Sequence, residues 1–252
     1  MFDETITITG FQLRRTEKAR ALDAMKESLR ETNSDMIIFP EKWTTEEYKE
    51  DEILSVIESL DIGHIPLFIP GSFSISDDDI LYNRSYLFHY GKLIGHQDKI
   101  SLYADESRRY TAGSSIRVFS GDGLSIGISI CYDIDFPYYS KVLMREGCNM
   151  IVNPSLIRSN FTEEWHLYVS ARSLENRVPV ISINSLSEPF GGHSIAVLPY
   201  KDGTGYRIRK AVASDMKFDV TLNIKDYEDG RIRRFQEDPG TYSFAKIEVI
   251  KF

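Results

Sequence analysis

The sequence has few of the features that mark several common classes of protein. Only two of its 252 residues are cysteines, Cys131 and Cys148, so a disulfide framework is not expected and a reducing, cytoplasmic location fits best. No apolar run approaches the roughly 18 residues that would cross a membrane. The N-terminal MFDETITITG lacks a basic region followed by a long apolar core, so a signal peptide is not expected.

A basic excess is also missing. The 30 Lys and Arg residues face 38 Asp and Glu residues, a formal net charge of −8, whereas nucleic-acid-binding proteins usually carry a basic surface. The densest basic cluster, GRIRRF at 230–235, lies between the acidic KDYED and QEDPG, which predicts a solvated surface segment. The five histidines and two cysteines show no zinc-site spacing, so neither a metal nor a nucleic-acid partner is expected.

Strand-like and helix-like segments alternate through the first two thirds of the chain. Helical spacing of apolar residues predicts helices over 16–32, 45–60, 136–146 and 163–176. Short apolar or alternating runs predict strands at 5–10, 35–40, 66–76, 86–90, 124–131, 149–154, 178–184, 193–199, 205–213, 217–224 and 241–250. Because one twisted sheet rarely holds so many strands, we expect an α/β domain over 1–252 with two stacked sheets covered by helices.

The segment LSIGISIC at 124–131 has two unlike faces. Leucine and isoleucine alternate on one side, and Ser125, Gly127, Ser129 and Cys131 occupy the other. Small side chains let a neighbouring layer approach closely, or leave room for a pocket near the end of the strand. The cysteine is followed by an acidic turn, YDIDFP.

Three chemically complementary residues follow three predicted strands. Glu41 follows DMIIFP, Lys99 follows the strand near 86–96, and Cys131 ends LSIGISI. Taken singly, the charged residues are ordinary solvated loop residues and the cysteine an ordinary small apolar one. Ligands of open α/β sheets, however, tend to bind beyond the carboxyl ends of the strands, so the three together suggest a site.

This set suits nucleophilic catalysis. A free thiol has a pKa near 8.5, so only about a few per cent is thiolate at neutral pH, and a nearby carboxylate can accept its proton as attack proceeds. A lysine ammonium can orient that carboxylate and stabilise an oxyanion. The N–H of the residue after the nucleophile, Tyr132, is placed to donate to the same oxyanion.

The motifs around these residues resemble those of the nitrilase superfamily of carbon–nitrogen hydrolases. The resemblance runs in order through IIFPEKW, HQDKISLY, ADESRRYTAG, GISICYDIDFP, WHLYVSARSLENRVPVISIN and GGHSIAVLPYKDG, nearly the whole chain. It implies a four-layer α-β-β-α sandwich that pairs into a homodimer or larger homo-oligomer and works without a cofactor. It further implies Cys131 as nucleophile, Glu41 as general base and acid, Lys99 as oxyanion stabiliser and Glu106 as an orienting second glutamate.

Within that family, Cys-Tyr-Asp resembles the amidase-like branches, which favours a small amide as substrate and an acyl-thioester intermediate. A nitrile or N-carbamoyl substrate stays open. Ser155, past the strand 149–154, is a further expected substrate-binding residue beside Tyr132. The chain departs from the family's usual Arg-Phe-Pro-Glu at Asp135 and Tyr138, which weakens any assignment of an acidic amide.

Two other readings remain. A binding or regulatory protein on the same fold is possible in principle, although decayed enzymes usually lose at least one of Glu41, Lys99 and Cys131. An unrelated Cys-His hydrolase would need a partnering histidine, and no histidine of the sequence lies in a motif that positions one.

Overall fold

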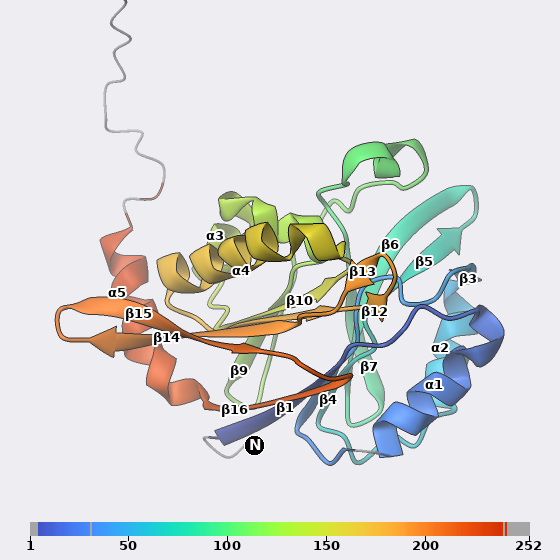
Figure 1. Cartoon of the computed structure of the whole chain (residues 1–252), viewed down its shortest axis with the longest axis horizontal. Coiled ribbons are helices and arrows are strands. Elements are labelled where there is room, and N and C mark those ends of the chain that lie inside the picture. Colours follow the sequence, from blue (N-terminus) through green and yellow to red (C-terminus); the bar gives the residue numbers. More distant parts are fainter. Residues whose placement is uncertain (1–4, 31, 239, 241–252) are drawn as a thin grey trace, which may run out of the picture.

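The structure is a computed structural model that describes residues 5–30, 32–238 and 240. Two mixed sheets are stacked face to face, and helices cover the outer face of each (Figure 1). This confirms the predicted four-layer α-β-β-α sandwich. None of the helices in the described ranges has the length and apolar character that crossing a bilayer requires.

The first sheet contains most of the N-terminal half. Its strand order is β16 (Lys217–Asn223), β1 (Thr5–Phe11), β2 (Met36–Ile38), β4 (Leu67–Ile69), β6 (Ile80–His89), β5 (Ser72–Asp77) and β3 (Glu47–Lys49), with β7 (Lys92–Asp98) paired to β6. Helices α1 (Lys18–Arg30) and α2 (Glu50–Glu58) cover its outer face. The alternation of β2 explains this, since Ile37 packs with the helices while Met36 and Ile38 face the second sheet.

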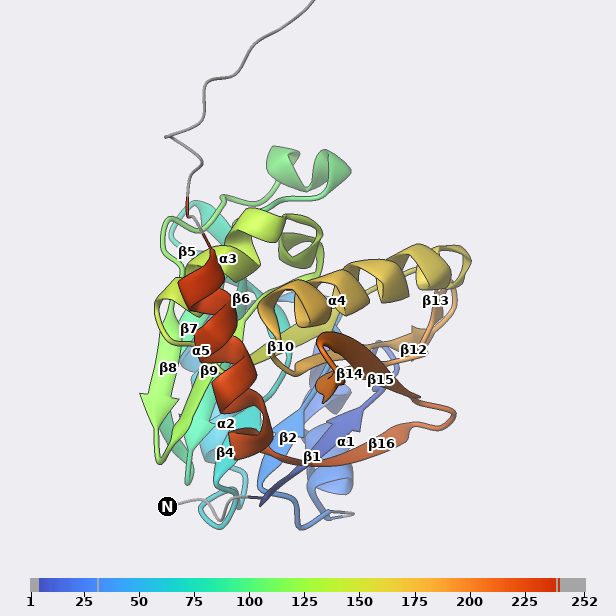
Figure 2. The same ribbon diagram turned by 90° about the vertical axis from the view of Figure 1, so that its left-hand side faces the viewer.

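The second sheet has the order β15 (Gly205–Val212), β14 (Ile195–Asp202), β11 (Val180–Asn184), β10 (Met150–Ser155), β9 (Leu124–Ile128) and β8 (Val118–Gly121). Helices α3 (Pro137–Arg145) and α4 (Thr162–Asn176) cover it, and α5 (Glu228–Glu237) lies beside them (Figure 2). The remaining elements are the hairpin of β12 (Leu186–Ser187) and β13 (Phe190–Gly191) and the 3₁₀ turns η1 (Ala104–Arg108), η2 (Cys131–Asp135), η3 (Ser159–Phe161) and η4 (Ile224–Tyr227).

Close contacts between layers depend on small residues. A Cβ on Gly127 would lie 2.5 Å from the side chain of Leu143 on α3, so of the two alternatives for the small-residue face of β9, close approach of a neighbouring layer holds at this position. Between the sheets, a Cβ on Gly10 would lie 2.1 Å from Ile183 of β11. The core between the sheets therefore requires close approach of β1 and β11.

Several predicted boundaries were wrong. The strand at 124–131 ends at Ile128, because the chain turns into η2 to deliver Cys131. The helix at 45–60 begins only at Glu50, after the short strand β3. The segment at 230–235 lies largely at the surface, as predicted, but it belongs to the helix α5. Periodicity did not indicate this helix, because Ile232 and Phe235 are exposed and do not form a buried apolar stripe. The predicted strand at 241–250 lies outside the described residues.

Candidate active site

The fold brings Glu41, Lys99 and Cys131 together from two different sheets. Glu41 follows β2 and Lys99 follows β7 of the first sheet, whereas Cys131 follows β9 of the second. All three are buried, with exposed fractions of 2%, 1% and 7%. The N–H of Glu41 donates to the carbonyl of Ser155 on β10 at 3.2 Å, which joins the two sheets directly at the site.

Glu41 is held by two hydrogen-bond donors. Lys99 Nζ donates to its Oε1 at 2.9 Å, and Asn83 Nδ2 donates to the same oxygen at 2.7 Å. Burial alone would lower the pKa of Lys99, but the negative charges of Glu41 and Glu106 outweigh burial and raise it. The lysine therefore stays an ammonium. With Oε1 occupied, the other oxygen of Glu41 is left for the thiol of Cys131.

Cys131 occupies a strained backbone position at the start of η2. Its φ is 45°, in the left-handed region that residues other than glycine rarely adopt. Asn153 Nδ2 donates to the carbonyls of Ser129 at 2.5 Å and Cys131 at 3.3 Å, which fixes this turn. Strain of this kind persists only where the surroundings enforce it, and it is common at functional sites.

Asp133 ties the turn that carries the cysteine to the segment that carries the lysine. Its Oδ1 accepts the N–H groups of Ile100 at 3.2 Å and Ser101 at 2.6 Å, and its Oδ2 accepts the N–H of Ile130 at 3.1 Å. Burial raises the pKa of Asp133 to about 6, although these N–H groups oppose the shift. The carboxylate thus fixes the segments of Lys99 and Cys131 relative to each other.

The thiol of Cys131 is not ionised in the resting site. Burial, together with the charge of Glu41, raises its pKa well above the ordinary value, and Lys99 offsets only part of this. The sequence predicted that a carboxylate, Glu41, accepts the proton of the thiol. The structure favours the base, because a carboxylate lies beside a protonated thiol.

We expect Cys131 to be alkylated by iodoacetamide at least about tenfold faster than Cys148. Cys148 is completely buried, its thiol donates to the carbonyl of Met150 at 2.9 Å, and burial raises its pKa to about 12. The Cys131 rate should still rise above pH 9, since its pKa is raised. Peptide mapping of the labelled native protein measures both rates, and equal labelling would contradict the assignment.

Glu106 joins the site from η1, which projects beyond the sheets (Figure 1). Its Oε2 accepts from Lys99 Nζ at 2.8 Å and from the N–H of Tyr103 at 2.9 Å. Its Oε1 accepts from Lys42 Nζ at 2.5 Å. Burial would raise its pKa, but Lys99 and Lys42 lower it to about 2, so Glu106 is ionised at neutral pH.

The sequence did not single out Lys42, Asn83, Asp133 or Asn153. Proximity in the sequence was the available signal for two of them: Lys42 directly follows Glu41, and Asp133 lies two residues after Cys131. Asn83 and Asn153 are buried polar residues within strands. Single-sequence patterning does not show which face of a strand meets a distant carboxylate.

Tyr132 and Ser155 remain predicted substrate-binding residues. Tyr132 is the second residue of η2, in the first turn, where N–H groups have no acceptor within the helix. The hydroxyl of Ser155 already bonds Asn153 Oδ1 at 2.6 Å and Ser182 at 3.0 Å. Ser155 is therefore placed to brace the strand ends through its hydroxyl and its carbonyl.

Asp135, where the chain departs from the family motif, lies at the end of η2. Its carbonyl accepts from Arg172 Nη2 at 2.7 Å, and the neighbouring carbonyl of Ile134 accepts from Arg172 Nε at 2.7 Å. Burial raises the pKa of the Asp135 carboxyl to about 6, against the charges of Arg172 and Lys99. Arg172 thus anchors this turn on α4 through main-chain oxygens.

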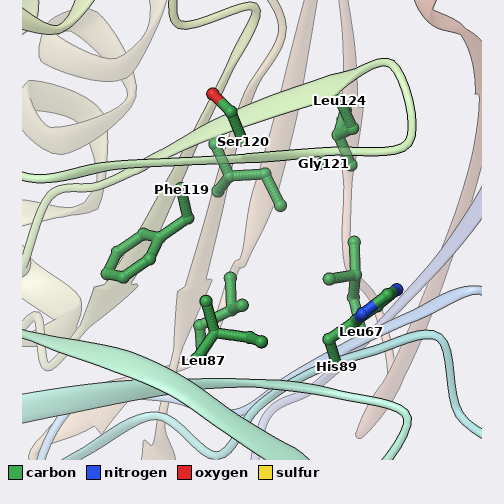
Figure 3. Close-up of a pocket in the computed structure, with 9 residues that line it drawn as sticks. Leu67, Leu87, His89, Phe119, Ser120, Gly121 and Leu124 are labelled. Carbon is green, nitrogen blue, oxygen red and sulfur yellow. The ribbon is translucent and has the colours of Figure 1, made fainter.

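A cavity of about 70 Å³ between the sheets lies away from this site (Figure 3). Its lining is mostly apolar and includes Leu87, Phe119 and Leu124, with His89 at one side. Leu124 begins β9 and Cys131 follows its end, so at ~3.3 Å per strand residue the two lie on the order of 20 Å apart. We therefore place the chemistry at the polar cluster and not in this cavity.

Within the described residues, no group of three or more His, Cys, Asp and Glu side chains is arranged to hold a metal ion. The site instead consists of a thiol, a carboxylate and an ammonium at the strand ends of an α-β-β-α sandwich. This combination is suited to nucleophilic attack by a thiol with a carboxylate as base. Over residues 12–201 the sequence matches the carbon–nitrogen hydrolase family, and the chain belongs to that family, part of the nitrilase superfamily.

Known relatives are consistent with this membership. The chain is 29% identical over 174 residues to the probable hydrolase YhcX of Bacillus subtilis, covering 59% of this chain but only 33% of YhcX. It is 26% identical over 185 residues to the 2-oxoglutaramate amidase of the same organism, covering 67% of this chain and 71% of that enzyme. The fold is similar to that of Saccharomyces cerevisiae Nit3, with a TM-score of 0.75, 22% identity and coverage of 95% and 96% of the two chains.

Proposed function

We propose that this protein hydrolyses the carbon–nitrogen bond of a small amide, releasing a carboxylic acid and ammonia through a thioester on Cys131. One observation carries the proposal: the buried Glu41–Lys99 ion pair lies beside the thiol at the junction of the two sheets. A binding protein on this fold would have no need to bury such a pair, which is costly unless its geometry is maintained.

In the first half of the reaction, Glu41 accepts the proton of Cys131 as sulfur attacks the amide carbon. The negative charge that develops on the carbonyl oxygen is stabilised by Lys99 and by the N–H of Tyr132. Glu41 then gives its proton to the leaving nitrogen, the carbon–nitrogen bond breaks, and ammonia departs. This leaves an acyl-thioester and an ionised Glu41.

In the second half, Glu41 takes a proton from a water molecule that attacks the thioester carbon. The carbon–sulfur bond breaks, the sulfur regains its proton from Glu41, and the acid is released. Lys99 remains charged throughout, because the surrounding carboxylates raise its pKa. Glu106 holds the lysine between two carboxylates while charge moves at Cys131.

An amide is the favoured substrate class for two reasons. The Cys131-Tyr132-Asp133 motif resembles the amidase-like branches, and an amidase for 2-oxoglutaramate is among the relatives. A screen for ammonia release over small amides, nitriles and N-carbamoyl compounds tests this. If only nitriles or N-carbamoyl compounds were hydrolysed, the proposed amide substrate would be wrong. If none of the three classes released ammonia while Glu41, Lys99 and Cys131 are intact, the proposed enzymatic function would be overturned.

We also propose a homodimer formed through the α3–α4 layer. Large apolar side chains are exposed there, which is typical of an interaction surface: Phe136, Tyr138, Phe161, Leu167, Tyr168 and Leu174. A solution mass near that of a single chain at micromolar concentration would contradict it. We propose a cytoplasmic location, which the two free cysteines support. We also propose a single domain over 1–252, which is supported by a core cluster that includes residues from Ile6 to Tyr227.

A further inference from the structure

Four charged side chains of alternating sign form one connected chain at the active site. Lys99 Nζ lies 2.9 Å from Glu41 and 2.8 Å from Glu106, and Lys42 Nζ lies 2.5 Å from the other oxygen of Glu106. The inner pair is fully buried, whereas Glu106 and Lys42 have exposed side-chain fractions of only 15% and 17%. Lys42 therefore ends the chain at the edge of the site and not in bulk solvent.

The backbone directs Lys42 to this position. Its φ is 38°, a left-handed conformation that is uncommon for lysine, and its N–H donates to the carbonyl of Ser72 at 2.9 Å. This turn lets the consecutive residues Glu41 and Lys42 reach opposite ends of the same charge chain. The ammonium also lies 5.1 Å from the ring centre of Tyr110, whose hydroxyl bonds Ser74 at 2.7 Å.

The net charge of the four linked side chains depends on Lys42. Glu41 and Glu106 contribute two negative charges, and Lys99 alone contributes one positive charge, so without Lys42 the cluster would carry a net negative charge. Negative charge must develop on the sulfur and then on the substrate oxygen during attack. A site that is already strongly negative would oppose both steps. The second ammonium makes the four linked side chains neutral, so that the carboxylate of Asp133, which accepts backbone N–H groups, is not added to a net negative cluster.

We propose that Lys42 is a positioning residue of the active site, which acts through Glu106 to hold Lys99 and to neutralise the cluster before Cys131 attacks. The inference rests on the proposed roles of Glu41, Lys99 and Cys131. Burial would lower the pKa of Lys42, but Glu41 and Glu106 raise it, so the second ammonium is charged at neutral pH. The low pKa of Glu106 depends in turn on both lysines.

The test compares Lys42→Met, which keeps the length but removes the charge, with Lys42→Arg, which keeps the charge. Lys18→Met is a matched control. Lys18 also pairs with a glutamate, Glu52, at 2.5 Å and lies 4.5 Å from the ring centre of Tyr48, but neither of these partners belongs to the four-residue cluster. All variants carry Cys148→Ala, so that iodoacetamide reports on Cys131 alone. Circular dichroism first confirms that each variant is folded at the assay temperature.

We expect Lys42→Met to slow alkylation of Cys131 on the order of tenfold at neutral pH and to move the pH–rate profile to higher pH, as loss of one nearby charge at an effective dielectric of ~20 implies. With a substrate from the screen, kcat should fall by a similar factor while KM changes less than about twofold. Lys42→Arg should recover most of both effects, and Lys18→Met should behave as the parent.

Three results would overturn the inference: an unchanged alkylation profile in Lys42→Met, equal impairment in the methionine and arginine variants, or a change in KM alone. The first would show that the charge does not reach the thiol, the second that only packing matters, and the third that Lys42 binds substrate. If the parent turns over no substrate, the proposed function fails, yet the alkylation comparison still decides the role of Lys42.

Discussion

Replacing Cys131 by alanine is expected to lower amide hydrolysis by about 10⁴-fold or more, since removal of a nucleophile from an acyl-transfer site leaves only binding and oxyanion stabilisation. The fold should persist, because the side chain is small and its thiol is not an ion in the resting state. Ammonia release under substrate saturation measures the loss, and circular dichroism measures the fold.

Cys148→Ala provides the matched control for this experiment. Cys148 is also a buried cysteine, just before β10 of the second sheet, but its thiol donates to the carbonyl of Met150 and lies outside the proposed site. It should keep activity close to that of the parent, with at most a modest loss of stability. Wild-type turnover by Cys131→Ala, or equal losses in both variants, would show that the nucleophile has been misassigned.

Replacing Lys99 by methionine is expected to impair both stability and activity. The change leaves Glu41 and Glu106 as neighbouring carboxylates without their shared ammonium, and breaking a buried ion pair by removing one partner costs about 3–5 kcal/mol. Activity of the folded fraction should fall about 10²–10³-fold, because the oxyanion loses a donor. Urea unfolding monitored by tryptophan fluorescence gives the free energy of unfolding.

A compensated variant separates these two effects. Adding Glu41→Gln and Glu106→Gln to Lys99→Met removes the uncompensated charges, so a substantial part of the lost stability should return, while activity should fall further because the proposed base is lost. If Lys99→Met were as stable as the parent, the ion pair would not be buried as the structure shows. If the triple change recovered activity, a different residue would be acting as the base.

The residues that meet at the candidate site were more predictable than its geometry. Glu41, Lys99 and Cys131 were found from their positions after strands, because strands of a sheet end near one another and side chains there can meet. The left-handed φ of Cys131 was not predictable, since no local residue preference favours it and the bonds of Asn153 impose it from another strand. The role of Asp133 likewise depends on backbone N–H groups about thirty residues away in sequence.

The same distinction holds for the fold. Periodicity located α1 and α3 well, because each buries apolar residues along one face. Helix α4 was also located, although its buried face is mostly polar and Leu167, Tyr168 and Leu174 are exposed. Periodicity failed for α5, which is fixed largely by polar contacts, among them Arg234 Nε to the carbonyl of Glu175 at 2.7 Å and Arg177 to Glu237 at 3.0 Å. Contacts of this kind carry no periodic signal in the sequence.

The proposed base and the proposed nucleophile follow strands of different sheets, so we expect the proposed reaction to be sensitive to how the two halves of the sandwich are aligned. Glu41 and Lys99 move with the first sheet and Cys131 with the second, and the main-chain bond from Glu41 to Ser155 spans them. A shift of about 1 Å between the layers would pull the carboxylate from the thiol while every strand stayed paired. The close approach of Gly10 to Ile183 is one of the contacts that hold the two layers together, and we expect the proposed proton transfer to depend on such contacts although neither residue belongs to the proposed site.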